Sequence, residues 1–197
     1  MHKSKFNDLR IESVSKQFPG VKALDKVSMD ISTGKVHALM GENGAGKSTL
    51  IKILAGAYSK DEGKIFFDED ELTIDSPHDS LDHGIKVVHQ EISLISGFTV
   101  GENIFLENFH ANKFGIVNWK KLYKDSEELF SKIGFDLDPR AIVSDLSISQ
   151  QQMVEIARAV FQNASIVIMD EPTSSLTPNE IKKLFDVIDN LKKNNIA

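Results

Sequence analysis

The sequence predicts an α/β fold in which a mixed sheet core is interrupted by a helical insertion. Two short apolar runs, GKVHALMG at residues 34–41 and SIVIMD at 165–170, are typical of buried central strands. Strand patterns disappear from about residue 99 to residue 160, where apolar residues recur at helical spacing. We therefore expect the two central strands to lie on either side of a helical insertion.

The N-terminal part is predicted to contain an antiparallel β-subdomain. Residues 6–18 and 24–32 alternate apolar and polar side chains, which predicts two antiparallel strands. A helix is expected over 46–58, because its leucines and isoleucines share one face, and a further pair of strands is expected over 63–74. These strands would form a sheet beside the central core.

The second half of the chain is predicted to be mostly helical. Pro77 favours a short helix before a strand at 85–90, and Pro178 favours another helix start. Four longer segments carry helical patterns: 99–109, 118–134, 148–162 and 177–194. The expected division is a core formed by 1–90 and 161–197, incomplete at its C-terminus, with a helical subdomain over 91–160.

Composition indicates a soluble globular chain. Hydrophobic residues make up 41% and charged residues 26%, a balance that excludes a disordered protein. No apolar stretch approaches the roughly 18 residues of a membrane span, and the first ten residues lack the apolar run of a signal peptide. The net charge of −6 disfavours a nucleic-acid partner, and the absence of cysteine excludes disulfides and thiolate metal sites.

The run GENGAGKST matches the phosphate-binding pattern G-x-x-x-x-G-K-[ST], between an apolar strand pattern and a helical one. Glycines let successive N–H groups point at phosphate oxygens, and the following helix adds partial positive charge. Lys47 can reach the β- and γ-phosphates of a nucleotide, and the Ser48 hydroxyl can ligate Mg²⁺. The candidate nucleotide-binding residues here are Gly41, Glu42, Asn43, Gly44, Ala45, Gly46, Lys47, Ser48 and Thr49.

Two acids follow the second apolar strand. Asp170 ends that strand, at the sheet edge where a carboxylate can hold Mg²⁺ through water beside the phosphate loop. Glu171 comes directly after it and is placed to polarise an attacking water. The alternative is that Asp170 only starts a turn.

The phosphate loop alone leaves several classes open, among them small-molecule kinases, GTPases, helicases and transport ATPases. The chain has no N-K-x-D guanine reader, which disfavours a GTPase. Over nearly its whole length the sequence resembles the ATP-binding-cassette (ABC) ATPases. Gln90 matches the Q-loop glutamine of that family, and Phe18 matches the aromatic residue that stacks on adenine. The family's LSGGQ signature corresponds to Leu146, Ser147, Ile148, Ser149 and Gln150.

The resemblance implies a mechanism. ATP would stack on Phe18, and Ser48 and Gln90 would hold Mg²⁺, with Asp170 acting through water. Glu171 and Gln90 would be the catalytic residues. The signature helix would complete the ATP site of a second cassette, fused or homodimeric, through a serine hydroxyl and N–H groups. An ordinary N-cap by Ser147 or Ser149 is a second reading of this helix start, compatible with the first.

Longer runs, such as KQFPGVKALDKVSMDI and MDEPTSSLT, resemble the ribose- and galactose-type carbohydrate importers. That branch implies transmembrane permease subunits as partners, an indirect partner in a periplasmic or extracellular sugar-binding protein, and a peripheral position on the cytoplasmic face of the membrane. A nucleoside importer is the alternative substrate class. Less favoured are a soluble non-transport cassette ATPase and a phosphotransferase, which would have no use for Ser147.

Three departures from the family pattern stand out. Ile148 and Ser149 replace the signature glycines, and their side chains are expected to crowd the opposing γ-phosphate. Thr177 stands where most cassettes have the D-loop aspartate. All six histidines lie at or before His110, so the switch histidine expected about 30 residues after the acidic strand is absent. We therefore expect this chain alone to bind ATP but to hydrolyse it poorly.

Overall fold

The computed structural model describes residues 8–88, 92–106, 109, 115–174 and 176–197. It divides into two compact units. Unit 1 comprises Met1–Val87, Asn163–Ile168 and Lys192–Ala197, and unit 2 comprises Val88–Gln162 and Met169–Leu191. In the described ranges, no helix is both long enough and apolar enough to cross a membrane.

The N-terminal strands of unit 1 form the predicted antiparallel sheet. Its strands lie in the order β2-β1-β3-β4, and each neighbouring pair is antiparallel. The strands are β1 (Asp8–Phe18), β2 (Val21–Ser32), β3 (Glu62–Phe67) and β4 (Asp70–Glu71). The tight hairpin between β1 and β2 turns at Gly20, whose φ of 82° favours glycine.

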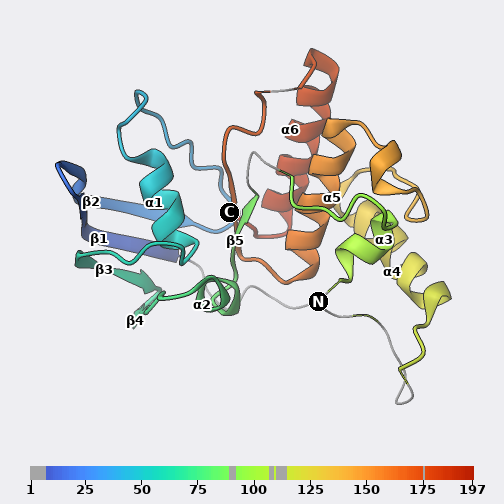
Figure 1. Cartoon of the computed structure of the whole chain (residues 1–197), viewed down its shortest axis with the longest axis horizontal. Coiled ribbons are helices and arrows are strands. Elements are labelled where there is room, and N and C mark those ends of the chain that lie inside the picture. The colour runs from blue at the N-terminus through green and yellow to red at the C-terminus, as the bar shows by residue number, and fades with distance from the viewer. Residues whose placement is uncertain (1–7, 89–91, 107–108, 110–114, 175) are drawn as a thin grey trace. The chain divides into compact units, whose positions relative to one another are not determined.

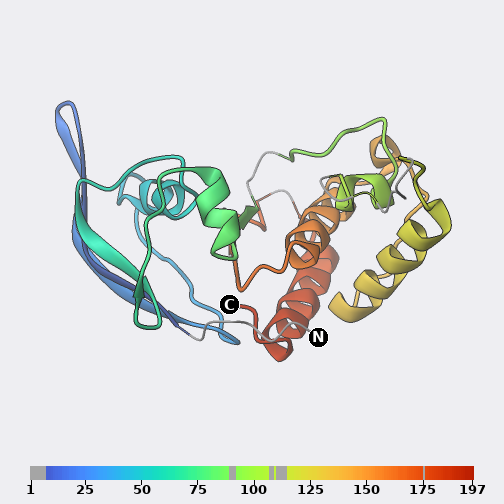
Figure 2. The same cartoon turned by 90° about the horizontal axis from the view of Figure 1, so that it is seen from below.

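One helix packs its apolar side on this sheet (Figure 1). It is α1 (Lys47–Leu54), and its residues Leu50, Ile53 and Leu54 lie in one core with the inward residues of β1 and β3. Figure 2 shows the curved sheet with α1 on its concave side. The short helix α2 (Pro77–Asp82) begins at the predicted proline, and the side chain of Ser76 caps it by accepting from the N–H of Asp79. The core residues here include Leu9, Ile11, Val14, Leu50, Ile53, Leu54, Ile65 and Phe67.

Two further strands, β5 (Ile85–Val88) and β6 (Ile166–Met169), pair with each other as a second sheet. Gly84 accepts the N–H groups of Ser165 and Ile166 at one end of the pair, and Val88 accepts that of Asp170 at the other. The bonds advance along both strands in the same direction, so the pair is parallel. Both strands were expected from their apolar runs.

Unit 2 is helical over its described residues, as the second half of the sequence predicts. Its helices are α3 (Val100–Ile104), α4 (Trp119–Ile133), α5 (Ile148–Phe161) and α6 (Pro178–Lys193), with a 3-10 turn over Val143–Asp145. In both views of Figures 1 and 2, α5 and α6 run side by side. The buried core between these helices includes Ile104, Phe105, Leu122, Phe130, Met153, Ile156, Leu184 and Val187.

The prediction of a central strand over residues 34–41 is wrong. Residues 36–40 form no strand, and Val36, Leu39 and Met40 are 59%, 41% and 87% exposed. A strand needs a neighbour for its N–H and C=O groups, and no described strand pairs with this segment. Ser32 N–H instead donates to His37 Nε2 at 3.0 Å, which ties the segment to the end of β2.

Candidate functional site

The glycine turn before α1 has the backbone that its sequence predicts. Gly44 and Gly46 have φ angles of 84° and 89°, in the left-handed region that L side chains rarely adopt. The N–H of Ala45 donates to Glu42 O at 3.1 Å, which closes the turn. A Cβ on Gly46 would lie 2.4 Å from the carbonyl oxygen of Ala23, so the turn also presses closely on β2.

The first turn of α1 lacks the groups that usually satisfy a helix start. Gly46 is the N-cap residue and has no side chain to offer, and no acidic residue lies in the first turn. The first i→i−4 bond runs from Leu50 N–H to Gly46 O at 2.9 Å. The N-terminus therefore keeps its partial positive charge available to an anion.

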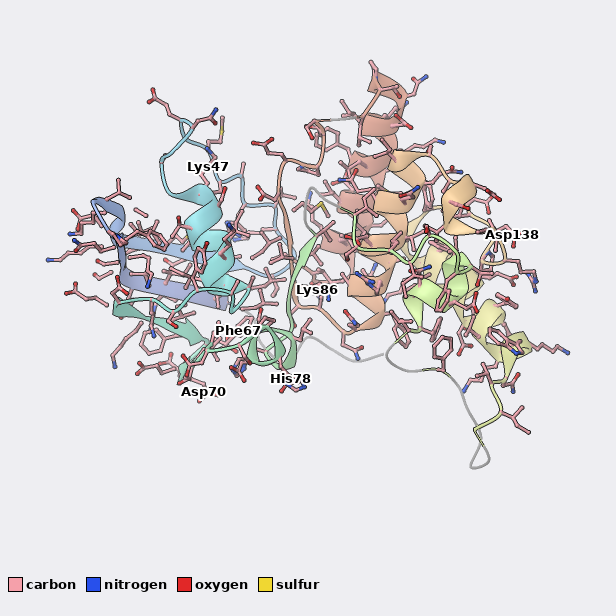
Figure 3. All side chains as sticks on the ribbon, viewed as in Figure 1. Lys47, Phe67, Asp70, His78, Lys86 and Asp138 are labelled. Atoms are coloured by element: carbon pink, nitrogen blue, oxygen red, sulfur yellow. The ribbon has the colours of Figure 1, made fainter. Side chains whose placement is uncertain are left out.

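Lys47 adds a full charge at the same place. Its ammonium group donates to the carbonyl oxygens of Gly41 at 2.6 Å and Glu42 at 2.9 Å, across the mouth of the glycine turn. Figure 3 labels this side chain at the start of α1. Ser48 is exposed beside it. Together these groups can bind a polyphosphate and present a hydroxyl oxygen to a divalent cation.

The two acids after β6 lie at its carboxyl end. Asp170 is partly exposed, and its N–H donates to Val88 O at 3.2 Å. Glu171 is exposed and has φ of 47°, an uncommon backbone for glutamate. The N–H and hydroxyl of Ser174 both donate to Glu171 O, which holds the strained residue in its turn. The arrangement leaves the Glu171 carboxylate open to water.

The signature segment forms a reciprocal cap at the start of α5. Ser147 Oγ accepts from Gln150 N–H at 3.3 Å, and Gln150 Oε1 accepts from Ser147 N–H at 2.9 Å. This is a capping box, and it matches the ordinary N-cap reading of the motif. The Ser147 hydroxyl uses an acceptor lone pair here and keeps its own proton to donate.

The two residues that replace the signature glycines point in different directions. Ser149 is only 5% exposed, whereas Ile148 is 55% exposed. Any crowding of a ligand at this helix start would therefore come from Ile148. Ser149 lies within hydrogen-bond reach of Glu180, which also accepts from the N–H and hydroxyl of Thr177 at the start of α6. These bonds, with those from Thr177 the strongest, hold the pKa of Glu180 below its ordinary value.

Phe18, the predicted adenine-stacking residue, lies at the end of β1 and is partly exposed. Its ring meets that of Tyr58, with the centroids 5.5 Å apart. Gln90, the predicted Q-loop glutamine, lies outside the described residues. Phe18 and the glycine turn fall in unit 1, and the signature segment with Asp170 and Glu171 falls in unit 2.

Sequence reasoning missed a buried polar cluster on α5. Glu155 is 5% exposed, and its Oε1 accepts from Ser93 N–H and Ser93 Oγ, both at 2.8 Å. Arg158 donates to Ser93 Oγ at 2.8 Å and lies 3.4 Å from Glu155 Oε1. A glutamate inside the apolar run MVEIARAV was the available signal. Among the described residues, no group of three or more His, Cys, Asp or Glu could hold a metal ion.

Comparison with known proteins shows which family and which relatives the chain resembles. The model of the ABC transporter family matches residues 24–174. The chain is 52% identical over 190 residues to the ribose import ATP-binding protein of Clostridium perfringens, covering 96% of this chain and 38% of that protein. It is 47% identical over 192 residues to the galactose/methyl galactoside import ATP-binding protein of Clostridium tetani, with the same coverage of 96% and 38%.

A solved structure shows the same fold. The ADP conformation of an ATP-binding cassette of an ABC transporter superimposes with a TM-score of 0.82 at 28% identity, covering 98% of this chain and 79% of that one. A nucleotide-free cassette matches with a TM-score of 0.81 at 28% identity, covering 96% and 79%. The predicted P-loop α/β fold is confirmed. The chain spans 38% of the length of the two import proteins, and by its family match it belongs to the ABC transporter family.

Proposed function

We propose that this chain is the ATP-binding and hydrolysing part of a subunit that energises import of a monosaccharide through a membrane permease. The observation that carries the proposal is the uncapped N-terminus of α1 behind a left-handed glycine turn, with Lys47 across its mouth. Such a site suits a polyphosphate. The names of the ribose and galactose import relatives support the choice of cargo.

In the proposed complex, ATP lies along unit 1. Adenine stacks on Phe18, and the phosphates lie in the turn from Gly41 to Thr49. Lys47 exchanges its two carbonyl partners for β- and γ-phosphate oxygens. This exchange keeps the ammonium group hydrogen-bonded throughout, so no charge is left without a partner.

The donor set fits Mg²⁺. The exposed Ser48 hydroxyl is a hard oxygen ligand at the phosphate turn, and the partly exposed Asp170 carboxylate suits contact through water. Gln90 is the further proposed ligand. Mg²⁺, when bound, would neutralise the charge that develops on the phosphates. A magnesium site of this kind is made largely by substrate phosphates and needs no cage of protein carboxylates.

The proposed hydrolytic residues are Glu171 and Gln90. The Glu171 carboxylate, exposed on a residue with a strained backbone, accepts a proton from the attacking water. Phosphoryl transfer asks mainly for positioning and charge stabilisation, so one oriented base suffices.

The proposed second cassette, fused or homodimeric, receives the signature segment from Leu146 to Gln150. The capped Ser147 keeps its hydroxyl proton, which donates to the γ-phosphate of the opposing ATP. Hydrolysis then lets the cassettes part. The core over 1–90 and 161–197 and the signature subdomain over 91–160 are the proposed moving parts. In this proposal the chain lies at the cytoplasmic face of the membrane. Its partners there are the transmembrane permease and, indirectly, the sugar-binding protein.

Titration of the chain with Mg·ATP tests nucleotide binding. Lys47→Ala is expected to lower the affinity by about ten- to a hundredfold, because it removes a charge-assisted bond worth about 1.5–3 kcal/mol. Lys64→Ala is the matched control, since Lys64 is an exposed lysine of the same unit that pairs with Glu71. Equal affinity of both variants would contradict the phosphate site.

Uptake of labelled ribose, galactose and a nucleoside tests the cargo. The measurement uses cells that express the full open reading frame with its permease. Glu171→Gln is expected to abolish uptake of the true cargo while nucleotide binding persists. Uptake of the nucleoside alone would replace the monosaccharide proposal with the nucleoside alternative.

A further inference from the structure

The ring of Tyr58 lies beside that of Phe18 in unit 1. The ring centroids are 5.5 Å apart and the ring planes meet at 68°, an edge-to-face contact. Tyr58 is 37% exposed and Phe18 is partly exposed, so the pair is a surface feature and no part of the core. We call this steeply angled pair of rings, Phe18 and Tyr58, the notch.

Both rings are held by bonds between the end of β1 and the loop after α1. Lys16 bridges to Asp61 at 2.7 Å, and its side chain is only 15% exposed. Asp61 Oδ2 accepts from Gln17 N–H at 2.7 Å, and Asp61 N–H donates to Ser15 O at 3.0 Å. The bonds from Lys16 and from Gln17 N–H hold the pKa of the Asp61 carboxyl below its ordinary value, with Lys16 the main cause.

The notch is also tied to the phosphate-binding helix. The ammonium group of Lys52, on α1, lies 5.2 Å from the centroid of the Tyr58 ring, and Tyr58 N–H donates to Lys52 O at 3.1 Å. Lys16 places its ammonium group 5.7 Å from the Phe18 centroid. Since α1 begins at Lys47, one helix connects the two rings to the phosphate turn.

We propose that Tyr58 is a positioning residue of the nucleotide base subsite: its ring holds Phe18 in the stacking orientation and bounds the edge of the base. The proposal rests on the proposed binding of ATP. An edge-to-face contact is worth about two- to tenfold in an equilibrium constant, because the positive edge of one ring meets the negative face of the other. The subsite therefore favours a planar aromatic base.

The test compares ATP with inorganic tripolyphosphate, which has the phosphates but no base. Both are titrated with Mg²⁺ into the full chain by calorimetry. Tyr58→Leu is expected to weaken ATP about two- to tenfold and to leave tripolyphosphate unchanged, while Tyr58→Phe keeps both affinities. Tyr123→Leu, the same change on a partly exposed ring of unit 2, is the matched control and leaves both affinities unchanged.

A second variant tests the proposal in case Tyr58→Leu misfolds the loop after α1. Asp61→Asn removes the ion pair with Lys16 and keeps an oxygen for Gln17 N–H, so it loosens the notch without removing a ring. It is expected to weaken ATP alone, by less than Tyr58→Leu. Unchanged ATP affinity in Tyr58→Leu, or equal weakening of both ligands, overturns the proposal.

The same titration separates this proposal from the one it rests on. An unaltered chain that binds tripolyphosphate as tightly as ATP overturns the base subsite and leaves the phosphate site intact. A chain that binds neither ligand overturns both proposals.

Discussion

The helices that begin at Lys47 and at Ile148 differ in how their first N–H groups are satisfied. At α1 the N-cap is a glycine without a side chain, and the Lys47 ammonium group binds the carbonyl oxygens of the turn. At α5 a serine and a glutamine cap each other's backbone, and a buried polar cluster holds the middle of the helix. Both helices start at sequence motifs of the family.

This difference determines what the N-terminus of each helix can offer a ligand. An uncapped turn can take a highly charged anion directly, because its donors have no competing partner. A capped turn keeps its own geometry without a ligand, and the hydroxyl proton of Ser147 stays available to a phosphate oxygen. The start of α1 therefore suits direct binding of an anion, whereas the start of α5 keeps its shape without one.

Gly46→Ala breaks the first region and has the largest expected effect. The added Cβ would lie 2.4 Å from Ala23 O on a backbone with φ of 89°, so strain and overpacking add. We expect a loss of about 2–5 kcal/mol in the local stability of unit 1, seen as faster amide hydrogen exchange over 47–54.

Gly44→Ala is the matched control. Gly44 has a similar φ of 84°, but no atom of the described residues lies within 4 Å of the methyl group that alanine would add. Only the backbone strain of about 1–2 kcal/mol applies. Equal losses in the two variants would show that close packing on β2 plays no part.

Glu155→Gln tests whether α5 is held through its buried polar cluster. The change leaves the Arg158 guanidinium without its carboxylate, and Arg158 is only 14% exposed. We expect about 2–4 kcal/mol less stability of unit 2 in urea, followed by the fluorescence of Trp119, the single tryptophan. Glu128→Gln, an exposed pair with Lys124 on α4, should cost less than about 0.5 kcal/mol.

Ser147→Ala removes the cap that distinguishes α5 from α1. The Gln150 N–H loses its acceptor, which is expected to cost unit 2 about 1 kcal/mol in the same urea assay. Ser144→Ala is the control, since that hydroxyl donates only to the adjacent Asp145. A Ser147 variant as stable as the control would place the stability of α5 entirely in its packing.

Acidification should have the smallest effect and bears on the start of α6. Bonds from Thr177 hold the folded-state pKa of Glu180 below its ordinary value of 4.5. A lowered pKa adds stability that is present above 4.5 and is lost as pH falls through the folded-state pKa. The melting temperature of unit 2 should therefore exceed that of Glu180→Gln at neutral pH and converge with it in acid. A difference that persists below the folded-state pKa would contradict this.

Most of the fold could be predicted because it rests on local patterns. The antiparallel strands, the helix start at Pro77 and the helices of unit 2 all follow from side-chain periodicity and turn residues. The strand prediction failed at residues 36–40 because an apolar run indicates only a preference for burial. A strand also needs a partner strand, which only the fold supplies.

Only part of the candidate site could likewise be predicted from the sequence. The shape of the glycine turn could be predicted because its glycines lie close together in one short run of the sequence. The Tyr58 contact with Phe18 and the Ser93 contact with Glu155 join residues 40 and 62 positions apart. A single sequence carries no pairing signal at such separations, so these partners emerge only from the folded chain.

Lys47 is already engaged with Gly41 and Glu42 before any anion arrives. Without an anion, these two carbonyl oxygens take the place of phosphate oxygens and keep the turn closed around Lys47. Replacing Lys47 by alanine thus alters the resting turn as well as the liganded one. The affinity lost in that variant will therefore have two parts. One is the missing attraction between the lysine and the phosphates, and the other is the cost of reshaping the altered turn.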